Sequence, residues 1–173
     1  MQAQDQLKFL RDGLAGLKDY LLSDELFWPM GGSQQLTPGN LLFAIAYLEG
    51  TGQSLANEAQ QLAALQTEWR QAWQKKTARE FDSRLRQWEH VLTEWADQPQ
   101  RYADYYATEV RLRALLELLA ETPEQRQQLA GPDALLRGLT VPGDFVWEPT
   151  AAAAFPAQAY WFLYRRPKPA DQD

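Results

Sequence analysis

The stretch EWRQAWQKKTAREFDSRLRQWEHVLTEW, residues 68–95, decides the architecture because it holds four of the seven tryptophans and contains neither glycine nor proline. From Leu55 to Asp97 nothing interrupts a helix, and Pro99 then ends it. Residues 55–97 would form a helix roughly 64 Å long, whereas a globule of this size is about 40 Å across. The sequence therefore predicts a mostly α-helical protein, a helical bundle with one central helix of about 40 residues. A break at residues 74–80, QKKTARE, is the alternative, because no large apolar side chain occurs there.

Apolar side chains recur along this predicted helix at helical spacing. Between residues 81 and 95 they follow the three- and four-residue steps of a coiled-coil seam or a bundle contact, and a second stripe precedes them. Such a line of large side chains requires an apolar partner, either helices of the same globule or a second copy in a dimer. The predicted packing anchors are Trp69, Trp73, Phe81, Trp88 and Trp95.

The charges of the same segment argue against binding to nucleic acid. Residues 68–97 carry six basic and six acidic side chains, and the whole chain has a net charge of −6. A binder of single strands normally has a net positive groove beneath its stacking aromatic residues. The local basic sequence KKTAR, residues 75–79, with Arg84 and Arg86 following, is interpreted as a solvated helix face.

Two further helices are predicted before residue 55. Leucines spaced by three and four residues predict a helix over residues 5–22. Pro29 and the Gly31–Gly32 pair then interrupt regular structure, and Thr37 followed by Pro38 is typical of a helix start. The helix from there to Gly50 is apolar almost all round, which predicts a place at the centre of the core.

The C-terminal half is expected to begin with a helix over residues 100–121, followed by two short helices, 123–131 and 132–139, each closed by a glycine. The aromatic segments DFVWEP (144–149) and AYWFLYRRP (159–167) then predict either a short C-terminal β-hairpin or, with Pro156 as its first residue, a terminal helix. Residues 1–166 are expected to form a single α-helical domain, and residues 167–173 a disordered tail.

The sequence offers few residues for catalysis or metal binding. It has no cysteine and one histidine, His90, which excludes thiolate chemistry and histidine-pair metal sites. No glycine-rich phosphate loop occurs. Neither a metal nor a cofactor is predicted. Two carboxylate pairs, Asp104 with Glu109 and Asp144 with Glu148, leave a carboxylate-dependent hydrolase as the least favoured function.

The sequence indicates a cytoplasmic protein. The N-terminal residues lack a basic region followed by an apolar run, and no stretch reaches the ~18 apolar residues of a membrane span. Neither a membrane nor a nucleic acid is an expected partner. The favoured hypothesis is a non-enzymatic protein–protein interaction, assembly or regulatory role, in which the tryptophan-bearing helix contacts a protein partner or a second copy.

A small-molecule or peptide-binding protein with an aromatic pocket is the alternative function. The pocket would lie between ELFWPMGG, residues 25–32, and YWFLYRR, residues 160–166. Aromatic rings from both segments would line it, and two arginines would be available to an anionic ligand. The residues predicted for this pocket are Trp28, Trp147, Trp161, Tyr164, Arg165 and Arg166.

Overall fold

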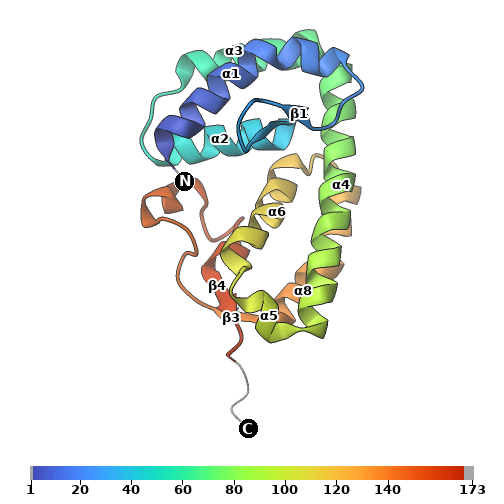
Figure 1. Ribbon diagram of the computed structural model, residues 1–173, viewed down its shortest axis with the longest axis vertical. Helices are drawn as coiled ribbons and strands as arrows, with labels where there is room; N and C mark the ends of the chain where they lie inside the picture. The colour runs from blue at the N-terminus through green and yellow to red at the C-terminus, as the bar shows by residue number, and fades with distance from the viewer. Residues whose placement is uncertain (1, 170–173) are drawn as a thin grey trace.

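The computed structural model describes residues 2–169, which contain eight α-helices, two short 3-10 helices and two small antiparallel strand pairs (Figure 1). The α-helices are α1 (Ala3–Leu22), α2 (Pro38–Gly50), α3 (Ala56–Glu68), α4 (Arg70–Asp97), α5 (Pro99–Ala103), α6 (Tyr106–Leu119), α7 (Pro123–Gln128) and α8 (Ala130–Leu139). The strands are β1 (Trp28–Pro29), β2 (Gln35–Leu36), β3 (Thr140–Pro142) and β4 (Arg165–Pro167), and the 3-10 helices are η1 (Pro149–Ala154) and η2 (Trp161–Tyr164).

Helix α4 runs along one side of the molecule and packs against α1, α2, α6 and α8 (Figure 1). Its length is 28 residues, so the predicted helix of about 40 residues is wrong. The break lies at Trp69, where the torsions φ −111° and ψ 38° depart from helical values. The alternative break at residues 74–80 is also wrong, because these residues lie inside α4.

The elbow at Trp69 keeps helical hydrogen bonds on both sides. The Trp69 N–H donates to the Leu65 carbonyl at 2.9 Å, and its own carbonyl accepts from the Trp73 N–H at 2.9 Å. The turn lays α3 against α1, where Leu62 is buried and Arg11 pairs with Glu58 at 2.9 Å. A straight helix would have left these contacts in water, so burial on α1 favours the bend.

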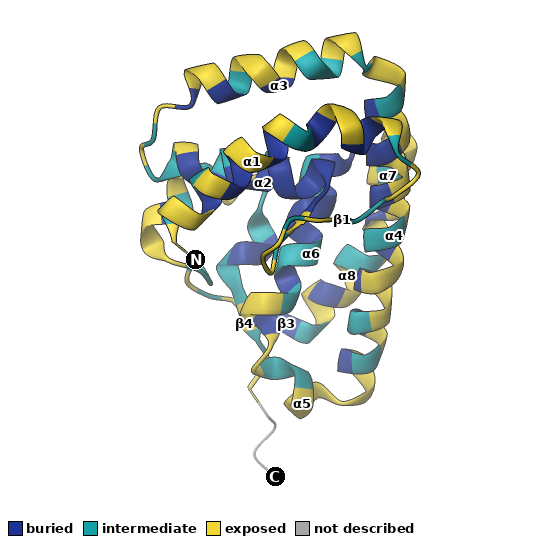
Figure 2. Cartoon of the chain, turned by 45° about the horizontal axis from the view of Figure 1, so that its top comes forward, coloured by how far each residue is buried: buried dark blue, intermediate teal, exposed yellow. Residues whose placement is uncertain are grey.

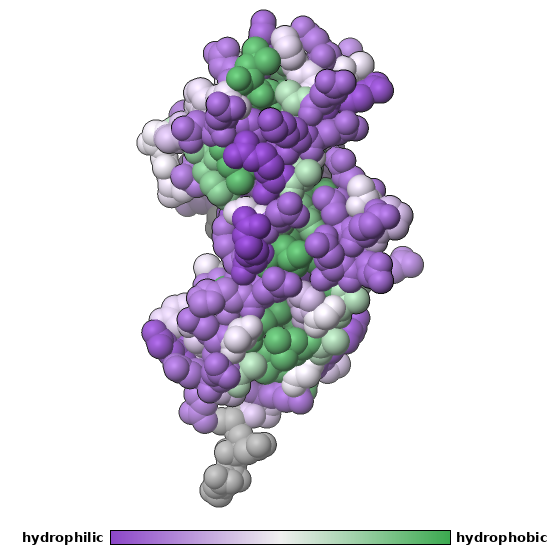
Figure 3. All heavy atoms as spheres, turned by 90° about the vertical axis from the view of Figure 1, so that its right-hand side faces the viewer, coloured by the Kyte–Doolittle hydropathy of each residue, from purple (hydrophilic) through white to green (hydrophobic). Residues whose placement is uncertain are grey.

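The tryptophan stripe of α4 is covered by the chain itself. Trp88 and Phe81 are fully buried, Trp95 is 2% exposed, and its ring lies 5.3 Å from that of Tyr106 on α6. On the face of the molecule that carries α4, apolar patches are small and separated by hydrophilic side chains (Figure 3). Of the two alternatives for this stripe, packing inside the same globule is therefore the arrangement observed.

The polar middle of α4 is buried on one side, so the interpretation of residues 75–79 as a solvated face holds for Lys75 and Arg79 but not for Lys76 and Thr77. Lys76 is 3% exposed, Thr77 is 2% exposed and Glu80 is fully buried, whereas Lys75 and Arg79 face solvent. The Lys76 ammonium donates to the carbonyl oxygens of Ser23, at 2.8 Å, and Glu25 in the loop after α1. This part of α4 lacks large apolar side chains because its inward side chains bind backbone groups of the protein.

The predicted N-terminal helices are confirmed as α1 and α2. The Thr37 hydroxyl accepts from the Asn40 N–H at 3.1 Å, which caps the start of α2. Helix α2 is the most enclosed helix, as predicted from its apolar composition, and packs against α1, α4, α6 and η1 (Figure 2). At its end the backbone of Gly50 approaches Ala154 of η1 so closely that an added Cβ would lie 2.2 Å from the Ala154 Cβ.

The helix predicted over residues 100–121 is divided into α5 and α6 at Asp104–Tyr105. The division turns Tyr106 inward, where its hydroxyl donates to the Phe162 carbonyl. The two predicted short helices exist as α7 and α8, but neither is closed by its glycine, because Gly131 and Gly138 both lie inside α8.

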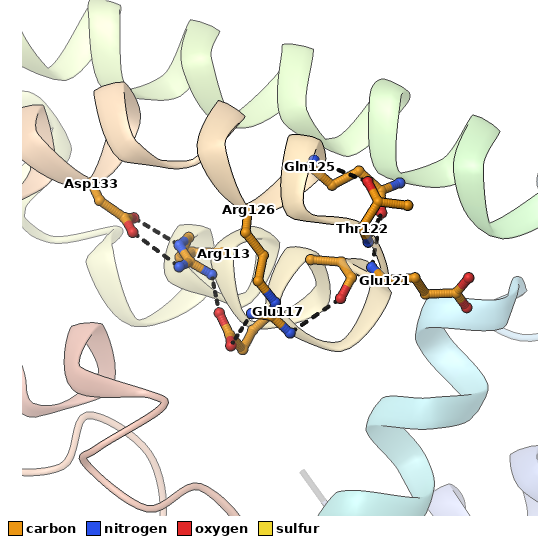
Figure 4. A network of polar contacts seen from close by, with 8 residues as sticks. Arg113, Glu117, Glu121, Thr122, Gln125, Arg126 and Asp133 are labelled. Atoms are coloured by element: carbon orange, nitrogen blue, oxygen red, sulfur yellow. Dashed lines mark hydrogen bonds and ion pairs between the residues drawn. The ribbon is translucent and has the colours of Figure 1, made fainter.

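An ion-pair network holds α6, α7 and α8 together (Figure 4). The Arg113 guanidinium binds Asp133 through two hydrogen bonds of 2.7 and 3.0 Å, and Glu117 through a third of 2.9 Å. Arg126 extends the network to Glu117 at 3.0 Å. Since each charge has an opposite charge beside it, the network is structural and fixes one side of α6.

The C-terminal segment forms an antiparallel strand pair, but its first strand is not the predicted one. Strand β4 pairs with β3, with Val141 opposite Arg166, while residues 144–149 precede and enter η1 and residues 161–164 form η2. A terminal helix from Pro156 is absent from the described residues. Pro167 belongs to β4, and residues 170–173 of the predicted tail lie outside the described residues.

Candidate functional site

Two adjoining pockets lie along α6 on the side away from the ion-pair network. The first, which we call the Trp147 pocket, encloses about 590 Å³, and the second, the arginine pocket, encloses about 270 Å³. They share Thr108 and Arg111, which stand one turn apart on α6 and so face the same way. The Trp147 pocket is lined by Tyr47, Ala107, Thr108, Arg111, Val146, Trp147 and Glu148.

The Trp147 ring forms one wall and is held in a fixed position. Its indole N–H donates to the Ala107 carbonyl at 2.7 Å, which ties the segment before η1 to the first turn of α6. The ring also meets Phe43, Phe145 and Phe155 edge to face, with centroids 5.4–5.9 Å apart. Such contacts fix ring orientation, so this wall is formed before any ligand arrives.

The arginine pocket has a polar lining drawn from three distant parts of the chain. The loop before α2 and the first turn of that helix supply amide and hydroxyl groups, and α4 and α6 supply one guanidinium each. Its polar residues are Ser33, Gln34, Gln35, Asn40, Arg84, Thr108 and Arg111.

Arg111 is a half-buried cation whose direct contacts are neutral groups. Its guanidinium stands 4.5 Å above the Phe43 ring and donates to the Asn40 side-chain oxygen at 3.2 Å. Among residues 2–169 no carboxylate lies within 4.0 Å of it, and its buried Nε–H has no hydrogen-bond partner. Burial and the neighbouring Arg84 lower the pKa of Arg111 to about 10, so it stays charged at neutral pH.

The carboxylate of Glu80 acts on both arginines. It receives the Gly39 N–H at 2.8 Å and pairs with Arg84 at 3.3 Å. An added Cβ at Gly39 would lie 2.8 Å from the carboxylate, so the glycine makes this approach possible. Burial raises the pKa of Glu80, against the lowering effects of Gly39, Thr37 and Arg84. Glu80 thus pairs with Arg84 and attracts Arg111 without contact, so two guanidinium charges stand near one carboxylate and the arginine pocket has an excess of one positive charge.

The structure separates the residues predicted for an aromatic pocket. Trp147 lines the pocket named after it, whereas the Trp28 ring packs against Tyr20 at 6.2 Å. Trp161 lies against the guanidinium of Arg137, at 3.6 Å, and that of Arg165, at 5.7 Å. Within residues 2–169, the pocket that contains Met30, Gly31 and Gly32 has no residue of segment 160–166 in its lining.

The two arginines and the tyrosine predicted for that pocket have other contacts. Arg165 donates to the hydroxyl and carbonyl of Thr140 at 2.6 and 2.8 Å and caps the end of α8. Arg166 is exposed on β4. The Tyr164 hydroxyl donates to the Phe155 carbonyl at 2.9 Å, and its ring lies 5.2 Å from that of Phe145, which also touches Trp147.

The predicted packing anchors lie along α4 and its elbow. Trp73, Phe81, Trp88 and Trp95 are buried inside the molecule, and Trp69 is half-buried with the Lys18 ammonium 5.5 Å from its ring centre. None of these five side chains lines the Trp147 pocket or the arginine pocket.

The carboxylate pairs do not meet in these pockets. Glu148 lines the Trp147 pocket and accepts from the Tyr47 hydroxyl at 3.0 Å, while Asp104, Glu109 and Asp144 line neither pocket. Over residues 2–169 no group of three or more acidic or histidine side chains is arranged to hold a metal ion. In the same part of the chain, no helix combines the length and apolar character needed to cross a membrane.

Reasoning from the sequence missed Arg84 and Arg111 as a pair. Arg84 was interpreted as part of a solvated face, and Arg111 stands in a leucine-rich helix without any marking motif. One signal was present: Leu115, four residues after Arg111, lies on the same face of the helix and places this cation beside an apolar side chain.

No protein-family model, curated protein or solved structure matches the chain.

Proposed function

We propose that the protein is a binding protein for a small organic molecule, which it takes up in the Trp147 pocket. The observation that carries this proposal is the prearranged wall around Trp147, held by the bond to Ala107 and by three aromatic rings. A pocket of about 590 Å³ lies within the usual range of small-molecule sites, which combine apolar walls with a few polar groups. No catalytic step is assigned to it.

The role in protein–protein interaction, assembly or regulation stays a prediction. The tryptophans that suggested a contact surface face the interior, so a protein partner or a second copy would have to bind elsewhere. Large apolar side chains that are exposed, such as Leu22, Tyr105 and Leu135, stand on different helices or their junctions. Ligand binding therefore has the stronger physical support.

The test is a fragment screen by protein NMR with a pocket-filling variant. Aromatic fragments should shift the Trp147 indole and Thr108 amide signals of the wild type. Thr108→Tyr places a ring in the shared wall of both pockets and should abolish these shifts. Thr93→Tyr changes another exposed helical threonine, on α4, and should leave binding unchanged. A screen without any hit at these signals, or binding that survives Thr108→Tyr, would refute the proposal.

A further inference from the structure

Arg111 is a desolvated cation that has no ion-pair partner within 4.0 Å among residues 2–169. A half-buried guanidinium loses hydration, and proteins usually compensate such a loss with a carboxylate. Among residues 2–169 the compensation consists of one side-chain amide oxygen, on Asn40, the face of the Phe43 ring, and the charge of Glu80, which attracts Arg111 without an ion pair within 4.0 Å. We therefore expect Arg111 to serve ligand binding rather than stability, because its side chain lines a pocket.

The guanidinium of Arg84 adds to the excess of positive charge around Arg111. Arg84 comes from α4 and lines the arginine pocket with Arg111, and its charge disfavours the charge of Arg111. Glu80 pairs with Arg84, but its other oxygen is occupied by the Gly39 N–H. Among residues 2–169 no carboxylate lines the arginine pocket itself, whereas hydroxyl and amide groups of Ser33, Gln35 and Thr108 do.

We propose that the two pockets form one site for an organic acid with an aromatic or alicyclic body. Its oxyanion, a carboxylate or a phosphate, binds Arg111 and Arg84 in the arginine pocket, and its apolar body lies against Trp147. This inference rests on the proposed function, because it names the class of ligand. A planar guanidinium fits the two oxygens of such a group, and the anion balances the excess positive charge of the arginine pocket, which Glu148 of the Trp147 pocket does not line.

The inference is tested with matched pairs of aromatic acids and their neutral amides, such as 2-naphthoate and 2-naphthamide, titrated by protein NMR. The acid should bind at least about tenfold more tightly than the amide, because a charge-assisted hydrogen bond replaces a neutral one. It should also shift the Arg111 Nε–H signal. Inorganic phosphate alone should shift that signal and leave the Trp147 indole signal in place.

Two variants make the test specific. Arg111→Met should equalise the affinities for acid and amide, while Arg86→Met, which removes an exposed arginine from α4, should preserve the preference. The melting temperature of Arg111→Met should be equal to that of the wild type or higher, since the variant removes a desolvated cation. A merely structural arginine would instead lower the melting temperature when it is replaced.

The outcomes separate this inference from the proposed function. If amides bind at Trp147 as tightly as acids and phosphate does not shift the Arg111 signal, the proposed anion site is wrong and the proposed binding function stands. If phosphate shifts the Arg111 signal but no fragment reaches Trp147, the anion site is right and the proposed function fails. Absence of both effects overturns both proposals.

Discussion

Lys76 lies where α1, its following loop and α4 meet. Its ammonium donates to the Ser23 and Glu25 carbonyls and stands 4.4 Å from the centre of the Tyr20 ring, and burial lowers its pKa. We expect Lys76→Met to lower the free energy of unfolding by about 1–3 kcal/mol, the value of hydrogen bonds to a charged donor.

The adjacent lysine supplies the control for this substitution. Lys75 is exposed, and Lys75→Met should change the free energy of unfolding by less than about 0.5 kcal/mol. Urea denaturation of both variants measures the difference. Equal effects would contradict the role assigned to the buried ammonium.

Glu80 gives a pH dependence whose sign follows from its burial. Its pKa in the folded protein is raised above the ordinary 4.5, so the folded state holds the proton more tightly than the unfolded chain. The stabilising contribution is complete below pH 4.5 and is lost as the pH rises through the folded pKa. Glutamine does not titrate.

We therefore expect the free energy of unfolding of Glu80→Gln, minus that of the wild type, to increase as the pH rises above 4.5. Urea denaturation of both proteins at a series of pH values measures this difference. A difference that stays constant or decreases would show that the buried carboxylate does not titrate as described.

At the scale of elements, alanine substitutions at two helical glycines should change stability in opposite directions. A Cβ at Gly50 would meet the Ala154 backbone nitrogen at 2.7 Å, whereas a Cβ at Gly16 of α1 has nothing within 4 Å. We expect Gly50→Ala to destabilise by about 1–3 kcal/mol through overpacking. Gly16→Ala should stabilise by roughly 0.5–1 kcal/mol through helix propensity. Thermal melts that gave both variants the same sign would contradict the close packing of α2 on η1.

The helices that were predicted well are marked by local sequence signals. Helix α2 begins at a Thr–Pro pair, and leucine spacing defined α1. The elbow at Trp69 has no such signal, because tryptophan is compatible with a helix and the bend is favoured by contacts with α1, distant in sequence. Strand β3 was likewise missed, because Phe145, Val146 and Trp147 have high strand propensity but pack against the core instead.

The candidate site was beyond prediction for the same reason. Trp147 was named from its aromatic surroundings, but Tyr47, Arg84 and Arg111, which line the two pockets, come from three different helices. Local sequence shows which face of a helix is apolar. It does not show which cation lacks a carboxylate, since that depends on every element packed around it.

At the scale of the whole molecule, the buried stripe predicts how stability responds to concentration. Trp88 is fully buried, and its indole N–H has no partner among the described residues. We expect Trp88→Ala to cost about 3–5 kcal/mol, the usual loss for a large aromatic side chain in a tight core. Because the stripe packs inside its own globule, the loss should be the same at all protein concentrations in denaturant melts. A loss that grows on dilution would place a second copy against α4.

Because the Lys76 ammonium is enclosed, its rate of chemical modification measures how often the corner between α1 and α4 opens. An amine-acylating reagent can reach Lys75 in the native protein, but it reaches Lys76 only while the corner between α1 and α4 is open. The ratio of the acylation rate of Lys76 to that of Lys75 therefore gives the fraction of time for which this corner is open. Peptide mass spectrometry of partly acylated protein would read that ratio directly, and any ligand that closes the corner would slow the label at Lys76 alone.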